Sequence, residues 1–546
     1  MWIQLDSGLP SMAGSFSTQL DMALIAPKQR SVVIIGGGPA GLTAAYELSK
    51  HGVPAVVLEA DATVGGLSRT VNYKGYLFDI GGHRFFTKWD EVNELWREVL
   101  EENFLERPRL SRIYYRKKFF FYPLKARNAL FGLGPLESIR IVFSYLRSRL
   151  FYYHNEQNLE QWVSNRFGRR LYEIFFKTYT EKVWGVPCTE IRAEWASQRI
   201  KGLSLTTAVR NALFKQKTPQ VKTLIDSFQY PQRGPGQMWE TLTNRLGRRG
   251  YPVLMERPVT KICHNGSGVT QLETRGPNGV ERFPGTHFIS SMPIRELVGA
   301  LDPPAPKEVQ RAAQQLRYRD FLIVSLIVNR KDVMPDNWIY VHEAGVRVGR
   351  IQNFKNWSPA MVPDTNKTCL GMEYFVFEND DLWSSSDQDL IELAKREIQK
   401  LGLVRAGEVE DGAVVRMPKA YPMYDNGWAE QVKTIRRYLE TALPNLQLVG
   451  RNGMHKYNNQ DHSMMTALCA ARNIMGANHD LWAINTEPEY HEEKQEERNE
   501  AVEAERRRPP YAEPSLIPRP VANLHQKASA TSLVTKTSRA KSASAN

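Results

Sequence analysis

The pattern of apolar and polar positions near the start of the chain predicts a strand, a helix and a second strand. Residues 31–35 (Ser-Val-Val-Ile-Ile) and 54–58 (Pro-Ala-Val-Val-Leu) are nearly continuous apolar runs, as expected of parallel strands buried on both faces. Between these runs, Leu42, Ala45 and Leu48 recur with helical spacing. We therefore expect a strand–helix–strand unit over residues 31–60.

Further along the chain, helical and strand-like patterns alternate. Helical patterns dominate from about residue 90 to 220, where a hairpin at 112–122 interrupts them. Apolar runs predict strands at 259–262, 269–274, 287–290 and 446–449, and a sheet over 318–377 that includes the buried run 321–328. A helix is expected near 463–475, and residues 486–510 would form a charged helix or no regular structure.

Length and composition exclude several classes of protein. The 546 residues predict two or three domains, and 42% hydrophobic with 24% charged residues exclude a wholly disordered or fibrous chain. No apolar run approaches the roughly 18–20 residues that span a bilayer. The four cysteines include no CxxC pair, so we expect neither a disulfide framework nor a metal site, and a cytoplasmic setting fits best.

The net charge of +13 is unevenly distributed. Residues 107–153 hold eleven Lys or Arg, a single acid and twelve Tyr or Phe. Such a segment is typical of a solvated amphipathic helix, of a phosphate site, or of contact with an anionic membrane surface, which would make the protein peripheral at a membrane. Nucleic acid is not expected as a partner, because no recognition motif accompanies the charge.

The motif richest in chemistry lies between the first predicted strand and helix and reads Gly36-Gly37-Gly38-Pro39-Ala40-Gly41. Gly36 permits a tight turn, Gly38 lets a pyrophosphate approach the backbone, and Gly41 allows the helix to pack on the strand. The helix N-terminus attracts the phosphates. Glu59, at the end of the second strand, can accept hydrogen bonds from both ribose hydroxyls and would repel a 2′-phosphate.

A second glycine pair, Gly65-Gly66, follows and precedes Arg69, which can offset pyrophosphate charge. The run from 32 to 69 resembles the dinucleotide fingerprint of the FAD-containing amine oxidase and protoporphyrinogen oxidase superfamily, although Thr63 replaces its usual arginine. The resemblance implies FAD, with NAD(P)H as one conceivable reductant. Within it, Val259 matches the adenine-side valine, and residues 450–461 match the C-terminal flavin segment.

Three segments further resemble the UDP-galactopyranose mutase branch: residues 81–87, 179–185 and 450–461. The first is similar to the loop beside the reactive edge of the flavin. The resemblance implies that flavin contacts include Gly81, Gly82, His83, Gly450, Arg451 and Asp461. It implies that catalytic groups include His83, Arg451 and Tyr457. The implied substrate contacts are Tyr179, Lys182, Trp184, Arg199, Tyr340, Tyr421 and Tyr457, because arginine and lysine suit diphosphates.

The sequence also departs from the mutases. Phe86 replaces the second histidine of the loop, and Leu203 replaces the second of two arginines that grip the diphosphate. We therefore expect a FAD-dependent oxidoreductase in which substrate hydride passes to flavin N5. The alternatives are a sugar-nucleotide isomerase without net redox, and a membrane- or partner-docked flavoprotein with little turnover. The substrate would be a small molecule, either phosphate-bearing or lipid-linked.

The resemblance implies an α/β (α+β) fold with a Rossmann-like FAD-binding domain and a discontinuous substrate domain of helices and an antiparallel sheet. The FAD-binding domain would be assembled from 30–90, 220–300 and 440–485. Residues 91–219 would form a helical insert facing substrate or membrane, and 301–439 would supply the antiparallel sheet. Residues 1–29 would be a flexible leader, and 486–546 a charged and then disordered tail.

Overall fold

The structure is a computed structural model that describes residues 30–122, 124, 126–193, 227–425 and 427–486. Its five-stranded sheet is parallel throughout and has the strand order β20-β13-β1-β2-β9. The strands are β1 (Val32–Ile35), β2 (Ala55–Leu58), β9 (Val253–Leu254), β13 (His287–Ser290) and β20 (Leu446–Leu448). Every residue of β1 is buried, as its continuous apolar run predicts.

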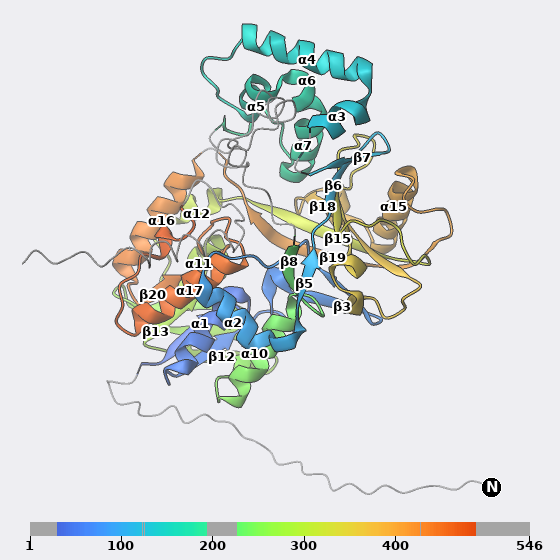
Figure 1. Ribbon diagram of the computed structural model, residues 1–546. Coiled ribbons are helices and arrows are strands. Elements are labelled where there is room, and N and C mark those ends of the chain that lie inside the picture. Colours follow the sequence, from blue (N-terminus) through green and yellow to red (C-terminus); the bar gives the residue numbers. More distant parts are fainter. Residues whose placement is uncertain (1–29, 123, 125, 194–226, 426, 487–546) are drawn as a thin grey trace, which may run out of the picture. The chain divides into compact units, whose positions relative to one another are not determined.

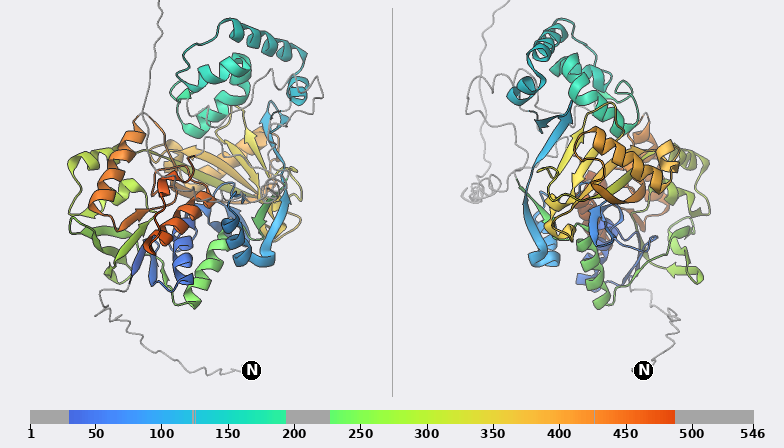
Figure 2. Two further views of the ribbon diagram at one scale, coloured as in Figure 1. Left: turned by 60° about the vertical axis from the view of Figure 1, so that its left-hand side comes forward. Right: turned by 90° about the vertical axis from the view of Figure 1, so that its right-hand side faces the viewer.

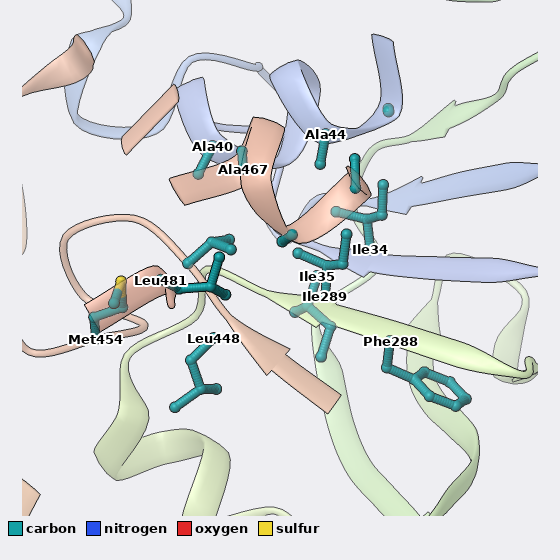
Figure 3. Close-up of a cluster of buried hydrophobic side chains, with 14 of the residues drawn as sticks. Ile34, Ile35, Ala40, Ala44, Phe288, Ile289, Leu448, Met454, Ala467 and Leu481 are labelled. Carbon is teal, nitrogen blue, oxygen red and sulfur yellow. The ribbon is translucent and has the colours of Figure 1, made fainter. Parts of the chain in front are cut away.

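Helices cover this sheet and join it to the rest of the chain. They are α1 (Pro39–Lys50), α2 (Asp90–Leu100), α10 (Gly236–Arg248) and α17 (Gln460–Ile474). Small side chains such as Ala40, Ala44 and Ala467 lie where α1 and α17 approach each other, beside Ile34 and Ile289 of the strands (Figure 3). The close approach of the two helices brings the start of α17 near the glycine-rich turn that precedes α1.

A second, four-stranded sheet has the strand order β12-β11-β10-β14. It comprises β10 (Val259–His264), β11 (Val269–Gly276), β12 (Gly279–Pro284) and β14 (Leu301–Asp302), and the neighbouring helices are α11 (Ile294–Gly299), α12 (Lys307–Gln315) and α16 (Trp428–Ala442). The strands predicted at 259–262, 269–274 and 287–290 are confirmed. The helix expected near 463–475 begins earlier, at Gln460, because Asn459 and His462 form a capping box there.

A seven-stranded sheet in the order β19-β15-β18-β17-β16-β6-β7 forms the second large unit. Its strands are β6 (Ser111–Tyr115), β7 (Lys118–Phe121), β15 (Tyr318–Val328), β16 (Trp338–Val341), β17 (Arg350–Asn353), β18 (Thr368–Val376) and β19 (Val409–Pro422). All residues of β15 and β18 are buried, because they occupy the middle of the sheet and α15 (Asp387–Lys400) packs on β15 and β19. Short helices α13 (Phe354–Trp357) and α14 (Asp381–Ser384) complete this unit.

Helices between the hairpin and residue 193 form a cluster at the outer end of the seven-stranded sheet (Figures 1 and 2). They are α3 (Ala126–Leu133), α4 (Pro135–Leu150), α5 (Leu159–Phe167), α6 (Arg169–Tyr172) and α7 (Thr178–Trp184). The hairpin predicted at 112–122 is confirmed as β6 and β7. Because β6 pairs with β16, the hairpin belongs to the large sheet and not to a purely helical insert.

Two small pairings were not predicted. Strand β3 (Thr70–Tyr73) pairs with β4 (Tyr76–Asp79), and β5 (Phe104–Pro108) pairs with the distant β8 (Ser227–Pro231). The mixed helix and sheet class is confirmed, whereas the division into domains stays a prediction, and pairings β5–β8 and β6–β16 cross its borders. The predicted leader (1–29) and, apart from Thr486, the predicted tail (486–546) lie outside the described residues.

Candidate active site

A cavity of about 620 Å³ is lined by residues from both large sheets. One part is bordered by the carboxyl ends of β1 and β2, and the other part by β16, β17 and β19 of the seven-stranded sheet. The residues predicted from the sequence that line it are Gly36, Gly38, Pro39, Ala40, Glu59, Gly66, Gly81, Gly82, His83, Val259, Tyr340, Tyr421, Gly450, Arg451, Tyr457 and Asp461. A single cavity therefore brings together nucleotide-type and substrate-type positions.

The glycine-rich turn between β1 and α1 forms one wall of this cavity. Gly36 has a φ of +100°, which favours glycine, and a Cβ on Gly41 would lie 1.8 Å from the carbonyl oxygen of Gly36. Gly41 is thus needed for packing. A Cβ on Gly38 would instead lie 3.8 Å from its nearest neighbour, Gly66, on the cavity wall. Helix α1 begins at Pro39 without a side-chain cap, so its N-terminus remains available to an anion.

Glu59 is held rigidly beside this turn. Its carboxylate accepts hydrogen bonds from the amide of Gly37 (2.6 Å) and from the amide of Asp61 (2.9 Å). The side chain is buried, and burial raises its pKa. Its place on the cavity wall at the end of β2 is that of the ribose-binding carboxylate of dinucleotide-binding folds.

The second glycine pair packs back onto the first turn. The amide of Gly65 donates to the carbonyl of Gly37 (2.9 Å), and Gly66 faces the cavity. Arg69 was predicted to offset pyrophosphate charge, but it does not line the cavity. Its guanidinium pairs with the carboxylate of Asp61. The cradle thus consists of backbone and Glu59, without an arginine from this loop.

The segment from 450 to 461 also lines the cavity, and Gly450 lies next to Ala40 of the glycine-rich turn. Arg451 donates through Nε to the carbonyl of Asn458 (2.9 Å) and through Nη1 to the carbonyl of Ala420 (3.1 Å). Its guanidinium lies 4.8 Å from the ring of Tyr457 and 5.7 Å from that of Tyr421. The two tyrosine rings are stacked with centroids 5.8 Å apart. These contacts fix a cation and two phenols on the cavity wall.

His83 lines the cavity and is close enough to Arg350 and Arg451 to experience their positive charge. Burial, together with the positive charges of Arg451 and Arg350, lowers the pKa of its imidazole to about 3. The ring is therefore neutral at physiological pH. Its Nδ1 is buried and makes no hydrogen bond with the described residues, so a bound molecule can supply that partner.

A buried ion pair, which was not predicted from the sequence, adjoins the part of the cavity bordered by the seven-stranded sheet, which we call the chamber. Arg350 on β17 lines the cavity, and its Nε bonds to Glu373 on β18, which is fully buried. The Nε2 group of Gln352 donates to the same carboxylate at 2.8 Å. Glu373 holds the arginine, and burial raises the pKa of this carboxyl although Arg350 lowers it. The signal that indicates such a site is a charged residue inside an otherwise apolar strand, here Thr368–Val376.

Apolar and aromatic side chains complete the chamber, and sequence reasoning missed these too. The rings of Trp338 and Trp357 are stacked with centroids 5.2 Å apart, and Met417 lies on the same wall. Trp338 is 5% exposed and Trp357 is 1% exposed, so both are mainly packing residues that present an edge to the cavity. The chamber can thus exclude water around an organic substrate.

Three predicted substrate contacts, Tyr179, Lys182 and Trp184, do not line the cavity. The Lys182 ammonium donates to three backbone carbonyls, those of Val341, Glu343 and Val348, at 2.7–3.2 Å, and therefore has a structural role. Tyr179 lies behind Tyr340 and stacks on His342. Trp184 ends α7 and does not line the cavity. Arg199 lies outside the described residues.

Comparisons with known proteins agree with this geometry. The sequence profile of flavin-containing amine oxidoreductases matches residues 39–475. Coproporphyrinogen III oxidase of Bacillus subtilis (strain 168) is 22% identical over 469 residues, which cover 77% of this chain and 93% of that protein. Reduced UDP-galactopyranose mutase superposes with a TM-score of 0.73 at 22% identity, over 85% of this chain and 97% of the other. Putrescine oxidase with bound putrescine superposes at 0.56 and 18% identity, over 82% and 99%.

Proposed function

The chain belongs to the flavin-containing amine oxidoreductase family, and we propose that it oxidises an organic substrate that carries an anionic group, with FAD as its cofactor. The observation that carries this proposal is the composition of the cavity. A glycine cradle with Glu59 borders one part, and an aromatic chamber with Arg350 and Arg451 borders the other.

The residues present suit FAD. The uncapped start of α1 and the open face of Gly38 can receive the pyrophosphate, and Glu59 can accept ribose hydroxyls. Val259 and the 450–461 segment border the remaining length of the cavity. When bound, FAD supplies the capacity to accept a hydride, which is two electrons and one proton, from the substrate.

The residues of the chamber would bind and orient the substrate. Glu373 compensates the charge of Arg350 and fixes its orientation. Arg451 donates to carbonyl oxygens, which carry no formal charge, so its positive charge remains to attract an anion. Stacked Tyr421 and Tyr457 support that guanidinium. A carboxylate or phosphate beside Arg451 would place the rest of the substrate against the aromatic wall.

His83 would act as a neutral hydrogen-bonding group. Its lowered pKa means that it carries no charge under assay conditions, so it would not bind the anion by charge. A neutral imidazole can donate or accept one hydrogen bond at its buried Nδ1. We assign it to holding the cofactor or the reacting part of the substrate in place.

A second candidate is an isomerase of sugar nucleotides that shows no net redox. It is favoured by arginine and tyrosine residues on one wall, which also suit a diphosphate. Against it, Lys182 and Trp184, which the mutase resemblance assigns to substrate, do not line the cavity. The two candidates differ in whether the substrate alone reduces the flavin.

The test is anaerobic mixing of the holoenzyme with compounds that carry a carboxylate or phosphate, each paired with its uncharged methyl ester or alcohol. An oxidoreductase of the proposed kind bleaches the flavin bands with the anionic member of a pair, and an electron acceptor restores them. Arg451→Met should weaken the binding of the anionic substrate about 100-fold, because a charge-assisted hydrogen bond contributes about 1.5–3 kcal/mol. Lys433→Met, an exposed lysine on α16, is the matched control.

Two results would overturn this proposal. One is equal reduction by charged and neutral members of a pair, and the other is conversion of a sugar nucleotide without bleaching. If Arg451→Met loses FAD, the double variant Arg350→Met/Glu373→Gln replaces it, since it removes both charges of the buried pair together.

A further inference from the structure

Helix α4 carries an apolar stripe on the side that faces away from the rest of the described chain. Its buried residues, Glu137, Ile141 and Tyr145, point inward. Figures 1 and 2 show α4 at the outer edge of the helical cluster, with α5 and α6 beneath it. On the inward side the buried carboxylate of Glu137 has a charged partner, Arg170 of α6. This ion pair lowers the pKa of the Glu137 carboxyl.

The outward side is apolar along its whole length. Residues 136, 139, 143, 146 and 150 follow one another at spacings of three and four, which place them along one face of a helix. With one residue on either side of α4 they form what we call the α4 apolar surface. It consists of Phe131, Leu136, Ile139, Phe143, Leu146, Leu150 and Phe151, each 55–81% exposed. Such an extended patch of large side chains marks an interaction site.

Arginines border this stripe. On a helix, Arg140 and Arg147 project on one side of the stripe and Arg149 on the other. The only acid in α4 is the inward-facing Glu137, so the exposed face of this helix carries positive charge alone. Elsewhere in the basic segment, Arg112 is already engaged by Asp336 through two hydrogen bonds. Of the arginines beside the stripe, Arg140 lies 3.7 Å from the carboxylate of Glu137, and Arg149 donates to the hydroxyl of Tyr145 at 3.1 Å. Arg147 lies over the ring of Phe151. Because the single carboxylate of Glu137 is shared with Arg116 and Arg170, a net positive charge remains beside the apolar surface.

We propose that the α4 apolar surface docks the protein on an anionic membrane, with α4 lying in the plane of the lipid headgroups. An apolar stripe bordered by arginines is the pattern of an interfacial helix, since the stripe enters the acyl boundary while the cations meet phosphate groups. A second copy of this chain fits less well, because two such faces would bring arginines together without acids to pair with them. No helix among the described residues is long and apolar enough to cross a bilayer. The inference is independent of the proposed function.

Vesicle co-sedimentation tests this inference on the full-length holoenzyme. The chain should bind phosphatidylglycerol-rich vesicles and bind pure phosphatidylcholine vesicles weakly, and added salt should reduce binding. Phe143→Ser/Leu146→Ser should lower the partition coefficient about 100-fold, since each large apolar side chain contributes about tenfold. Val280→Ser is the matched control, because Val280 is a 63% exposed apolar residue on β12, outside the surface.

Charge is tested separately. Arg147→Gln/Arg149→Gln should weaken binding about fivefold per arginine and flatten the salt dependence, whereas Arg248→Gln on α10 should not. Flavin content shows whether each variant is folded. If the double serine variant loses flavin, vesicle binding by the single variant Leu150→Ser is measured in its place. Absence of binding to anionic vesicles, or equal binding to neutral ones, would overturn the proposal. Self-association of the wild type that Phe143→Ser/Leu146→Ser abolishes, without vesicle binding, would assign the surface to a second copy instead.

Discussion

The two glycines at the start of α1 offer a matched pair of substitutions with opposite consequences. In Gly38→Ala the new Cβ lies 3.8 Å from Gly66, so the fold accepts it. In Gly41→Ala the Cβ lies 1.8 Å from a carbonyl oxygen of the backbone, which cannot move aside as a side chain can. The first substitution therefore tests the cofactor cradle, and the second tests packing.

The magnitudes follow from these distances. For Gly38→Ala, a less favourable N-cap and a reduced entropy of the unfolded chain oppose each other, each at about 1 kcal/mol or less, so the FAD-free protein should keep its stability. The new methyl group lies on the cavity wall where the pyrophosphate would bind, so it should weaken FAD binding at least ~100-fold. This loss of affinity removes about 2.7 kcal/mol of the stabilisation that bound FAD gives the fold. Gly41→Ala should cost about 3 kcal/mol even without FAD, the upper end for overpacking.

Thermal unfolding of deflavinated protein and titration with FAD separate the two effects. The expected result is an unchanged Tm and weak FAD binding for Gly38→Ala, and a lowered Tm for Gly41→Ala. If Gly38→Ala binds FAD as tightly as the wild type, the pyrophosphate does not approach this turn and the assignment of the cradle is refuted.

Three further predictions concern single groups. The pKa of His83 is about 3 in the fold and near 6.5 unfolded, so the unfolded chain binds more protons between these values and stability falls as pH decreases from 6.5. His83→Gln should reduce that acid sensitivity in urea unfolding of deflavinated protein, and an unchanged pH profile would contradict a neutral His83 ring in the folded protein. Lys182→Met leaves backbone carbonyls without their donor and should cost about 1–3 kcal/mol in urea unfolding, with unchanged KM; a raised KM would return Lys182 to the substrate site. Glu373→Gln should lower kcat/KM for an anionic substrate by freeing Arg350 to reorient, while FAD content stays constant; loss of FAD instead would place this pair in cofactor binding.

Local pattern was sufficient for the nucleotide-binding part of the molecule. The apolar runs, the glycine turn and Glu59 are contiguous in sequence, so their geometry follows from short-range rules. The predicted superfamily, the mixed helix and sheet class, and FAD are confirmed by the family match and the structural neighbours. The hairpin at 112–122 was equally local, but its partner strand β16 could not be read from its pattern.

The chamber was harder to predict, because it depends on pairing between distant strands. Arg350 meets Glu373 only because β17 and β18 are antiparallel neighbours in the required register. Lys182 has the type and motif of a phosphate ligand, yet its helix directs it to the carbonyls of a loop more than 150 residues away in sequence. Residue type and local motif therefore predicted that Gly38 and Glu59 lie together, because short-range geometry places them on the cavity wall, whereas the position of Lys182 depends on the tertiary fold.

The most direct measurement for the central claim is the visible absorption spectrum of the purified full chain, in air and then anaerobically with NADPH. An oxidoreductase that is reduced by its own organic substrate should show flavin bands in air that persist with NADPH alone. Bleaching by NADPH without another substrate would contradict that account and favour the isomerase. A colourless protein that takes up no added FAD would contradict the assignment of the cavity itself.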